Sequence, residues 1–251
     1  MYRTQQYLLT AIFCLALLSG CKCSGEKSQT DITSFWNGIP LLEENIQNSE
    51  DRLADFAELA VAAPEEKAKA AIDSLFLRLN EDEVAYYVYA EWFIGAFYHF
   101  LSPCRNCDLF TYTADKILQE QVLDSNILDK YERMRTACTT NRKGTQLTLP
   151  AVYDADGSPI DIPHGQRTLF LVLDLTCPSC REALQRMEDD PKYWDAWHIA
   201  LCSHPGPLPD TPGWTYFRVR SPEVVYDLAA APFYFVAGAD GTIEIEYTSA
   251  L

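Results

Sequence analysis

The chain has 251 residues, with 36 acidic and 20 basic side chains, a formal net charge of −16 and nine cysteines. Its length suggests one or two domains, and a hydrophobic fraction of 48% excludes wholesale disorder. The acidity argues against a nucleic-acid partner and against electrostatic attachment to anionic lipid, because both need clustered Lys and Arg.

The first twenty residues have the features of a secretory signal. Arg3 is followed by an apolar run over 8–18, which is too short to cross a bilayer because a spanning helix needs about 20 apolar residues. The run ends in Leu18-Ser19-Gly20-Cys21, which resembles the lipobox of bacterial lipoproteins. The resemblance implies cleavage before Cys21 and a lipid anchor on its sulfur, in a bacterial cell envelope and facing the periplasm or the cell surface. An ordinary signal peptide with a chance cysteine is the alternative.

Residues 21–36 are mostly polar and are expected to form a tether, followed by an all-α N-terminal domain over 37–143. Pro64-Glu65-Glu66 favours a first helical turn, and apolar residues then recur every three or four positions. Asn80-Glu81-Asp82-Glu83 resembles a capping box and predicts a helix to about Leu101. The aromatic residues of that helix indicate buried packing or, alternatively, a ligand groove. A further helix is expected over about 114–137.

The remaining residues, 144–251, alternate between strand-like and helical segments, which predicts an α/β domain. The continuous apolar run 169–173 is typical of a strand buried on both faces. Gly157 and Gly241 each follow an aspartate and mark hairpin turns. The other expected elements are a helix from Ser179 to about Asp189, strands near 197–201, 214–219, 233–236 and 242–247, and a short helix near 222–230.

Cys177-Pro178-Ser179-Cys180 lies between the apolar strand 169–173 and the following helix. A C-x-x-C motif by itself fits half of a zinc site, a soft-metal site or a redox pair. The position at a helix N-terminus favours the redox pair, because the helix dipole and unpaired N–H groups stabilise a thiolate at Cys177. Cys180 is one turn along and close enough to close a disulfide.

This arrangement resembles the thioredoxin fold, and more closely the thiol-disulfide oxidoreductases of the TlpA and ResA type that are anchored in bacterial envelopes. The resemblance covers about 145–247 and implies a cis-proline, Pro232, facing the cysteines. Thr176 stands where the family usually has tryptophan, and Asp174 is retained from a motif that often precedes the first cysteine. After Tyr247 the family fold normally adds a helix; we expect the helical domain or a second copy, in a homodimer, to cover the bare face.

The resemblance implies a role for each residue of the site. The Cys177 thiolate would attack a substrate disulfide, and Cys180 would then displace the reduced substrate. Pro232 would present a backbone edge to the substrate and keep metal off the cysteines, and Thr176 and Ala231 would be further substrate contacts. Asp174 would either relay a proton to Cys180 or satisfy nearby N–H groups. No metal and no cofactor are expected besides the redox-active Cys177–Cys180 disulfide.

The other cysteines leave several alternatives open. Cys104-Arg105-Asn106-Cys107 is a second C-x-x-C, with no strand before it, and fits a structural disulfide, a second redox pair or a metal clip. Cys138 can join either cysteine of that motif. Cys202 follows the strand 197–201. If this strand is parallel to 169–173, Cys202 lies at the same sheet edge as Cys177 and is a candidate third redox thiol; a buried bystander is the alternative.

The sequence therefore predicts an envelope lipoprotein that exchanges disulfides through Cys177 and Cys180. Its expected partners are disulfide- or thiol-containing envelope proteins, a membrane electron donor upstream, and the bilayer through Cys21. Pro178-Ser179 contains no basic residue, which favours a reductant. The alternatives are a metallochaperone that binds Cu(I) or Zn through the same cysteines, and a catalytically silent binding module.

Overall fold

The computed structural model describes residues 31–99, 101–162, 165–189, 195–203, 207–220, 225–226 and 231–249. The predicted signal and Cys21 lie outside the described residues, as does the helix expected near 222–230 apart from 225–226. The chain divides into two compact units after Tyr131. Among the helices of the described part, none combines the length and the apolar character needed to cross a bilayer.

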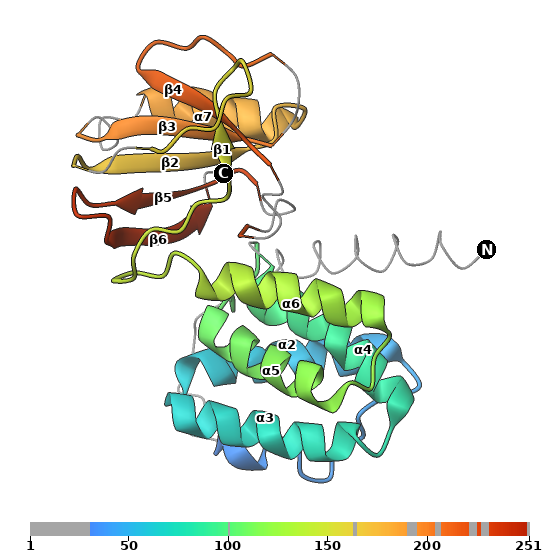
Figure 1. Ribbon diagram of the computed structural model, residues 1–251. Helices are drawn as coiled ribbons and strands as arrows, with labels where there is room; N and C mark the ends of the chain where they lie inside the picture. Colours follow the sequence, from blue (N-terminus) through green and yellow to red (C-terminus); the bar gives the residue numbers. More distant parts are fainter. Residues whose placement is uncertain are drawn as a thin grey trace. The chain divides into compact units, whose positions relative to one another are not determined.

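The N-terminal unit is helical (Figure 1). Its elements are η1 (Ile32–Ser34), α2 (Ile46–Ala62), α3 (Glu65–Leu79), α4 (Glu83–Phe93), the π-helical turn η2 (Ile94–Tyr98) and α5 (Cys107–Glu120). Helix α6 (Ser125–Thr139) contains the residue at which the two units divide.

Capping side chains explain where two of these helices begin. The Asp82 carboxylate accepts from the Ala85 N–H at 3.0 Å, so α4 begins after Asp82 and not at Asn80 as the capping-box pattern suggested. The Asn106 side chain accepts from the N–H groups of Asp108 and Leu109 at 3.0 and 3.1 Å and opens α5.

The single helix expected over 114–137 is wrong, because the structure has two helices there. Helix α5 ends at Glu120, because the next residue, Gln121, has a left-handed φ of 52° and cannot continue a right-handed helix. Helix α6 then begins at Ser125. The expected helix to Leu101 is also shorter as an α-helix, since it ends at Phe93 and continues as η2.

The aromatic residues of α4 and η2 form the core of the helical unit. Tyr86, Tyr89, Phe93 and Phe97 are each at most 1% exposed. The rings of Phe76 and Phe93 stack with centroids 5.7 Å apart. The aromatic density of this segment therefore reflects buried packing, which is one of the two alternatives left by the sequence.

The second unit contains a six-stranded mixed sheet in the order β1-β4-β3-β2-β5-β6. Strands β2, β3 and β4 are mutually parallel, and β1, β5 and β6 are each antiparallel to a neighbour. The strands are β1 (Val152–Tyr153), β2 (Thr168–Leu173), β3 (Trp197–Cys202), β4 (Trp214–Val219), β5 (Phe233–Ala237) and β6 (Ile243–Ser249). The thioredoxin-like class of fold predicted for this region is confirmed.

Strand β2 lies at the centre of the sheet and is buried on both faces, as its apolar run predicts. Leu169 and Leu171 point to the face that carries α7 (Pro178–Asp189), where they pack with Met187. Phe170 and Val172 point to the opposite face. Figure 1 shows α7 lying against the sheet. This packing of α7 on one face of the sheet fixes the start of α7 relative to the end of β2.

The connection from β3 to β4 is unusual for parallel strands, which are generally joined through a helix. The described residues of this connection, 203 and 207–213, include no helix. Leu208 packs against the same apolar cluster as Leu184 of α7. The surface next to α7 is thus bordered by a proline-containing loop.

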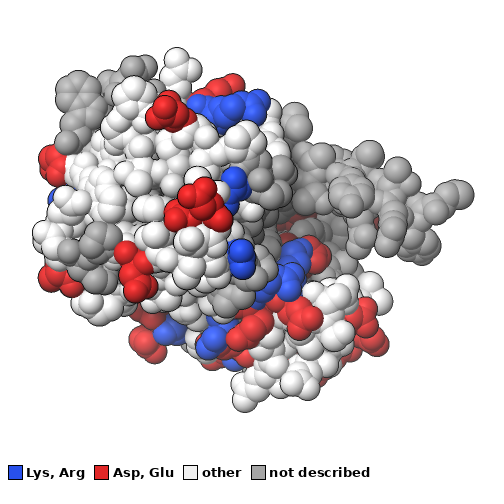
Figure 2. Space-filling view, turned by 45° about the horizontal axis from the view of Figure 1, so that its top comes forward, with Lys and Arg blue, Asp and Glu red and all other residues white. Residues whose placement is uncertain are grey.

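Charged side chains of both signs mix on the surface in Figure 2, where Lys and Arg lie among Asp and Glu. The described ion pairs include those of Arg167 with Asp195 at 2.6 Å and with Glu244 at 2.7 Å. The face shown therefore has no continuous basic surface of the kind that binds phosphate backbones.

Candidate active site

The fold places the two cysteines of the C-x-x-C motif at the N-terminus of α7. Pro178 is the first residue of the helix, a position where its missing N–H costs nothing. Cys177, immediately before the helix, is partly exposed, whereas Cys180 in the first turn is 1% exposed. Both residues are thiols, without a disulfide. One sulfur can thus meet another protein and the other cannot.

The two thiols differ in acidity as well as in exposure. The backbone N–H of Cys180 lowers the pKa of Cys177, assisted by the hydroxyl of Ser179. Burial raises the pKa of Cys180 to about 12, although its sulfur accepts from the Asp174 N–H at 3.4 Å. The pair therefore consists of an accessible thiol that ionises readily and a buried thiol that keeps its proton.

This difference predicts how alkylation depends on pH. Only the thiolate reacts with iodoacetamide, so the rate rises with pH through the pKa. Because the pKa of Cys177 is lowered, its rate should reach half-maximum at a lower pH than that of glutathione as a reference thiol. Cys180 should stay unmodified throughout the neutral range. Mass spectrometry of the labelled peptides measures both, and a Cys177 curve at or above that of glutathione would contradict the assignment.

The carboxylate of Asp174 organises the turn before Cys177. One of its oxygens accepts from the Thr176 N–H at 2.8 Å and from the Thr176 hydroxyl at 2.7 Å. The Asp174 carbonyl also accepts from the Cys177 N–H at 3.0 Å. Asp174 thus satisfies nearby donors, which is one of its two expected roles. Its negative charge contributes to the raised pKa of Cys180, and proton relay stays a prediction.

The structure brings the predicted proline segment to the cysteines. The Ala231–Pro232 peptide bond is cis, and Ala231, like Cys177, packs against the buried apolar cluster that contains Cys180. Antiparallel pairing of Val172 with Phe233 sets this segment beside the end of β2. Roles for Ala231, Pro232 and the exposed Thr176 in binding substrate stay predictions.

Cys202 lies at the same end of the sheet as the C-x-x-C motif. Strand β3 is parallel to β2 and pairs Cys202 with Leu173. Cys202 is fully buried in the cluster that holds Cys180, and burial raises its pKa to about 12. A second protein cannot reach this thiol in the folded state, so the described geometry favours a packing role.

The second C-x-x-C motif does not form a disulfide within itself. Cys107 and Cys138 are disulfide-bonded, while Cys104 is a buried thiol. The hypothesis that Cys104 and Cys107 make a structural disulfide together is therefore wrong. The sequence had indicated the alternative, in which Cys138 joins one cysteine of this motif.

Within the described part of the chain, no group of three or more His, Cys, Asp or Glu side chains is placed to hold a metal ion.

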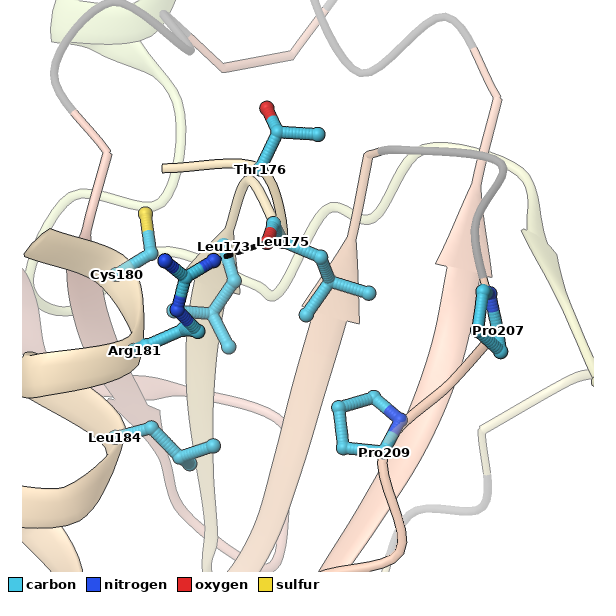
Figure 3. Close-up of a pocket in the computed structure, with 8 residues that line it drawn as sticks. All are labelled: Leu173, Leu175, Thr176, Cys180, Arg181, Leu184, Pro207 and Pro209. Carbon is cyan, nitrogen blue, oxygen red and sulfur yellow. Dashed lines mark hydrogen bonds between the residues drawn. The ribbon is translucent and has the colours of Figure 1, made fainter. Parts of the chain in front are cut away.

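A pocket next to the cysteine pair was not predicted. Its volume is about 330 Å³, and it lies between the start of α7 and the loop that precedes β4 (Figure 3). Its lining residues are Leu173, Leu175, Thr176, Cys180, Arg181, Leu184, Pro207 and Pro209. In the sequence, Pro207 and Pro209 indicate that this part of the connection between β3 and β4 forms no regular helix, and the pocket lies between that loop and α7.

No protein-family model matches the chain, and no curated protein matches it significantly. Among solved structures, it is similar to a thioredoxin-like protein from Bacteroides caccae, with a TM-score of 0.69, 15% identity and 87% of each chain covered. A domain of a possible thiol-disulfide isomerase from Cytophaga hutchinsonii has a TM-score of 0.36 and 15% identity, over 45% of this chain and 88% of that one. The N-terminal domain of PilB from Neisseria gonorrhoeae has a TM-score of 0.29 and 20% identity, over 37% and 74%.

The chain has a thioredoxin-like fold, which the similarity to the Bacteroides caccae structure supports. That similarity extends over more of the chain than the sheet unit contains, so it includes helical residues as well. On this fold, Cys177 and Cys180 form a disulfide-capable pair at the N-terminus of the helix that follows the central strand.

Proposed function

We propose that the protein is a thiol-disulfide oxidoreductase that acts through Cys177 and Cys180. The observation that carries the proposal is the opposite perturbation of the two thiols, since Cys177 is accessible with a lowered pKa and Cys180 is buried with a pKa of about 12. An attacking thiol has to be ionised and reachable, whereas a resolving thiol has only to reach the first sulfur.

The exchange proceeds in two displacements. The Cys177 thiolate attacks one sulfur of a substrate disulfide, a new S–S bond forms, and the other substrate sulfur leaves as a thiolate that takes up a proton from water. Cys180 then loses its proton and attacks the Cys177 sulfur, which expels the second substrate thiolate. The substrate disulfide is reduced by two electrons and the Cys177–Cys180 disulfide is formed. An external dithiol of a donor protein returns the two electrons.

The proton that Cys180 releases requires an acceptor, and we propose Asp174 for this role. Its backbone already contacts the Cys180 sulfur, and its charge acts on that thiol. Asp174→Asn keeps an oxygen that can accept from Thr176, so the turn should persist. In stopped-flow kinetics with a disulfide substrate, this variant should slow the second displacement several-fold and leave the first unchanged. A second displacement as fast in Asp174→Asn as in the wild type would show that Asp174 only organises the turn.

The proposal places the protein in a bacterial cell envelope, attached through a lipid on Cys21. Residues 18–21 are the support for this placement. Its partners would be envelope proteins that contain disulfides or thiols, together with a membrane donor of electrons. Mass spectrometry of the membrane fraction tests the attachment, because a Cys21 without lipid would contradict it.

Reduction of insulin by the purified protein, with dithiothreitol as the electron source, tests the activity. We expect precipitation of the insulin B chain well before it occurs with dithiothreitol alone. Titration with Cu(I) or Zn²⁺ under the same conditions tests the metallochaperone alternative. Tight one-to-one metal binding with no acceleration of insulin reduction would overturn the proposal.

A further inference from the structure

We infer that the pocket beside the cysteine pair receives an apolar side chain from the partner polypeptide, carried by a residue next to the cysteine that exchanges with Cys177. This inference rests on the proposed function, because the mixed disulfide with Cys177 is what brings the occupant to the pocket. It assigns a sequence preference to the substrate: a disulfide whose cysteine has a large apolar neighbour.

The lining of the pocket determines the kind of side chain that it accepts. Leu173, Leu175 and Leu184 contribute three aliphatic side chains, and two prolines form the opposite wall. In Figure 3, Leu175 and Leu184 point toward the space that faces Pro209. The two polar lining groups already have partners, since the Thr176 hydroxyl donates to Asp174 at 2.7 Å and the Arg181 guanidinium donates to the Leu175 carbonyl. A polar side chain buried there would lose its hydrogen bonds to water, whereas an apolar one would be stabilised by burial.

The position of the pocket ties it to the exchanging sulfur. Thr176 precedes Cys177 in the chain, Cys180 and Arg181 follow it within one helical turn, and all three of these neighbours line the pocket. Successive residues of an extended chain are about 3.3–3.6 Å apart. A side chain one or two residues from a cysteine bonded to Cys177 is therefore within reach of the space.

The pocket walls are held in place by local structure. The Arg181 guanidinium donates to the Leu175 carbonyl at 3.2 Å, which ties α7 to the turn after β2. Leu175 and Leu184 both pack against the buried cluster below them. The prolines restrict the backbone of the facing loop. A preformed wall binds with a smaller loss of conformational freedom than a mobile one.

Mixed disulfides between thionitrobenzoate and short peptides test the inference. The peptides differ only in the residue after cysteine, which is Leu, Ser or Asp, and the release of coloured thionitrobenzoate reports attack by Cys177. We expect the Leu peptide to react about tenfold faster than the Ser peptide, since burial of part of a Leu side chain corresponds to roughly this factor. The mixed disulfide of thionitrobenzoate with mercaptoethanol, which carries no amino-acid side chain, serves as the baseline.

Two variants of α7 test whether the faster reaction of the Leu peptide depends on the pocket or on another part of the protein. Leu184→Trp fills the space and should reduce the preference for the Leu peptide to less than about twofold. Gln185→Trp adds the same ring at an exposed neighbouring position that does not line the pocket, and it should retain the full preference. If Leu184→Trp fails to fold, Leu184→Ala replaces it and should extend the preference to a Trp peptide.

The outcomes distinguish the two proposals. Equal rates for the three peptides, together with normal reaction at the mixed disulfide of mercaptoethanol, would overturn the pocket inference and leave the exchange function standing. A preference for Leu that persists in Leu184→Trp would also overturn it. No reaction with any disulfide would overturn the proposed function itself.

Discussion

Replacing Cys180 with serine is expected to abolish the catalytic turnover of insulin reduction, by about a thousandfold or more, while the first displacement stays intact. Cys177 is the accessible thiol with the lowered pKa, so it can still attack the substrate. Without the buried Cys180 thiol, nothing within the site displaces the bound substrate. The pre-reduced variant, incubated with insulin in the absence of dithiothreitol, should therefore accumulate a mixed disulfide through Cys177, seen by non-reducing electrophoresis and mass spectrometry.

Two further variants make this result specific. Cys177→Ser should lose both turnover and the mixed disulfide, because the attacking sulfur is gone. Cys202→Ala removes another buried thiol from the same apolar cluster, and it should retain both. Equal accumulation of mixed disulfide in Cys177→Ser would show that a different cysteine attacks the substrate.

Phe170→Ala is expected to destabilise the sheet unit by about 3–5 kcal/mol, the usual cost of truncating a buried phenylalanine. Phe170 is 1% exposed at the centre of β2, and its ring stacks on Phe235 with centroids 5.1 Å apart. Because protein cores are close-packed, truncating this ring leaves a cavity that the surrounding residues fill only in part. This loss is a large share of the stability of an ordinary domain.

Calorimetry measures this effect, because the two units can unfold in separate transitions. The transition of the sheet unit should move to lower temperature and that of the helical unit should not. Leu77→Ala is the control, since Leu77 is 72% exposed on α3 and its truncation should cost less than about 0.5 kcal/mol. A shift of similar size in both variants would mean that Phe170 is not part of the core.

Much of the sheet unit could be predicted because its signals are local. The apolar run of β2 and the glycines at the two hairpin turns each specify backbone geometry within a few residues. The acidity of Cys177 was predictable for the same reason, since the N–H of Cys180 that lowers its pKa comes from the first turn of the helix that follows Cys177. The cis-proline before β5, in contrast, was predicted only through the resemblance to the thioredoxin fold.

Other features depended on contacts that no local pattern specifies. The break between α5 and α6 depends on a left-handed Gln121, a residue type without a strong preference for that conformation. The pocket depends on where the loop before β4 runs in relation to α7, which involves residues more than twenty positions apart. The state of Cys104 and Cys107 likewise followed from tertiary structure, because spacing alone does not decide connectivity.

The order of strands in the sheet also determines when the site can be completed during synthesis. Strand β2 is flanked by β3 on one side and by β5 on the other, so its second neighbour does not exist until residues 233–237 have been made. A ribosome-bound chain that ends before β5 consequently exposes one hydrogen-bonding edge of β2, directly beside the cysteines that the finished protein uses.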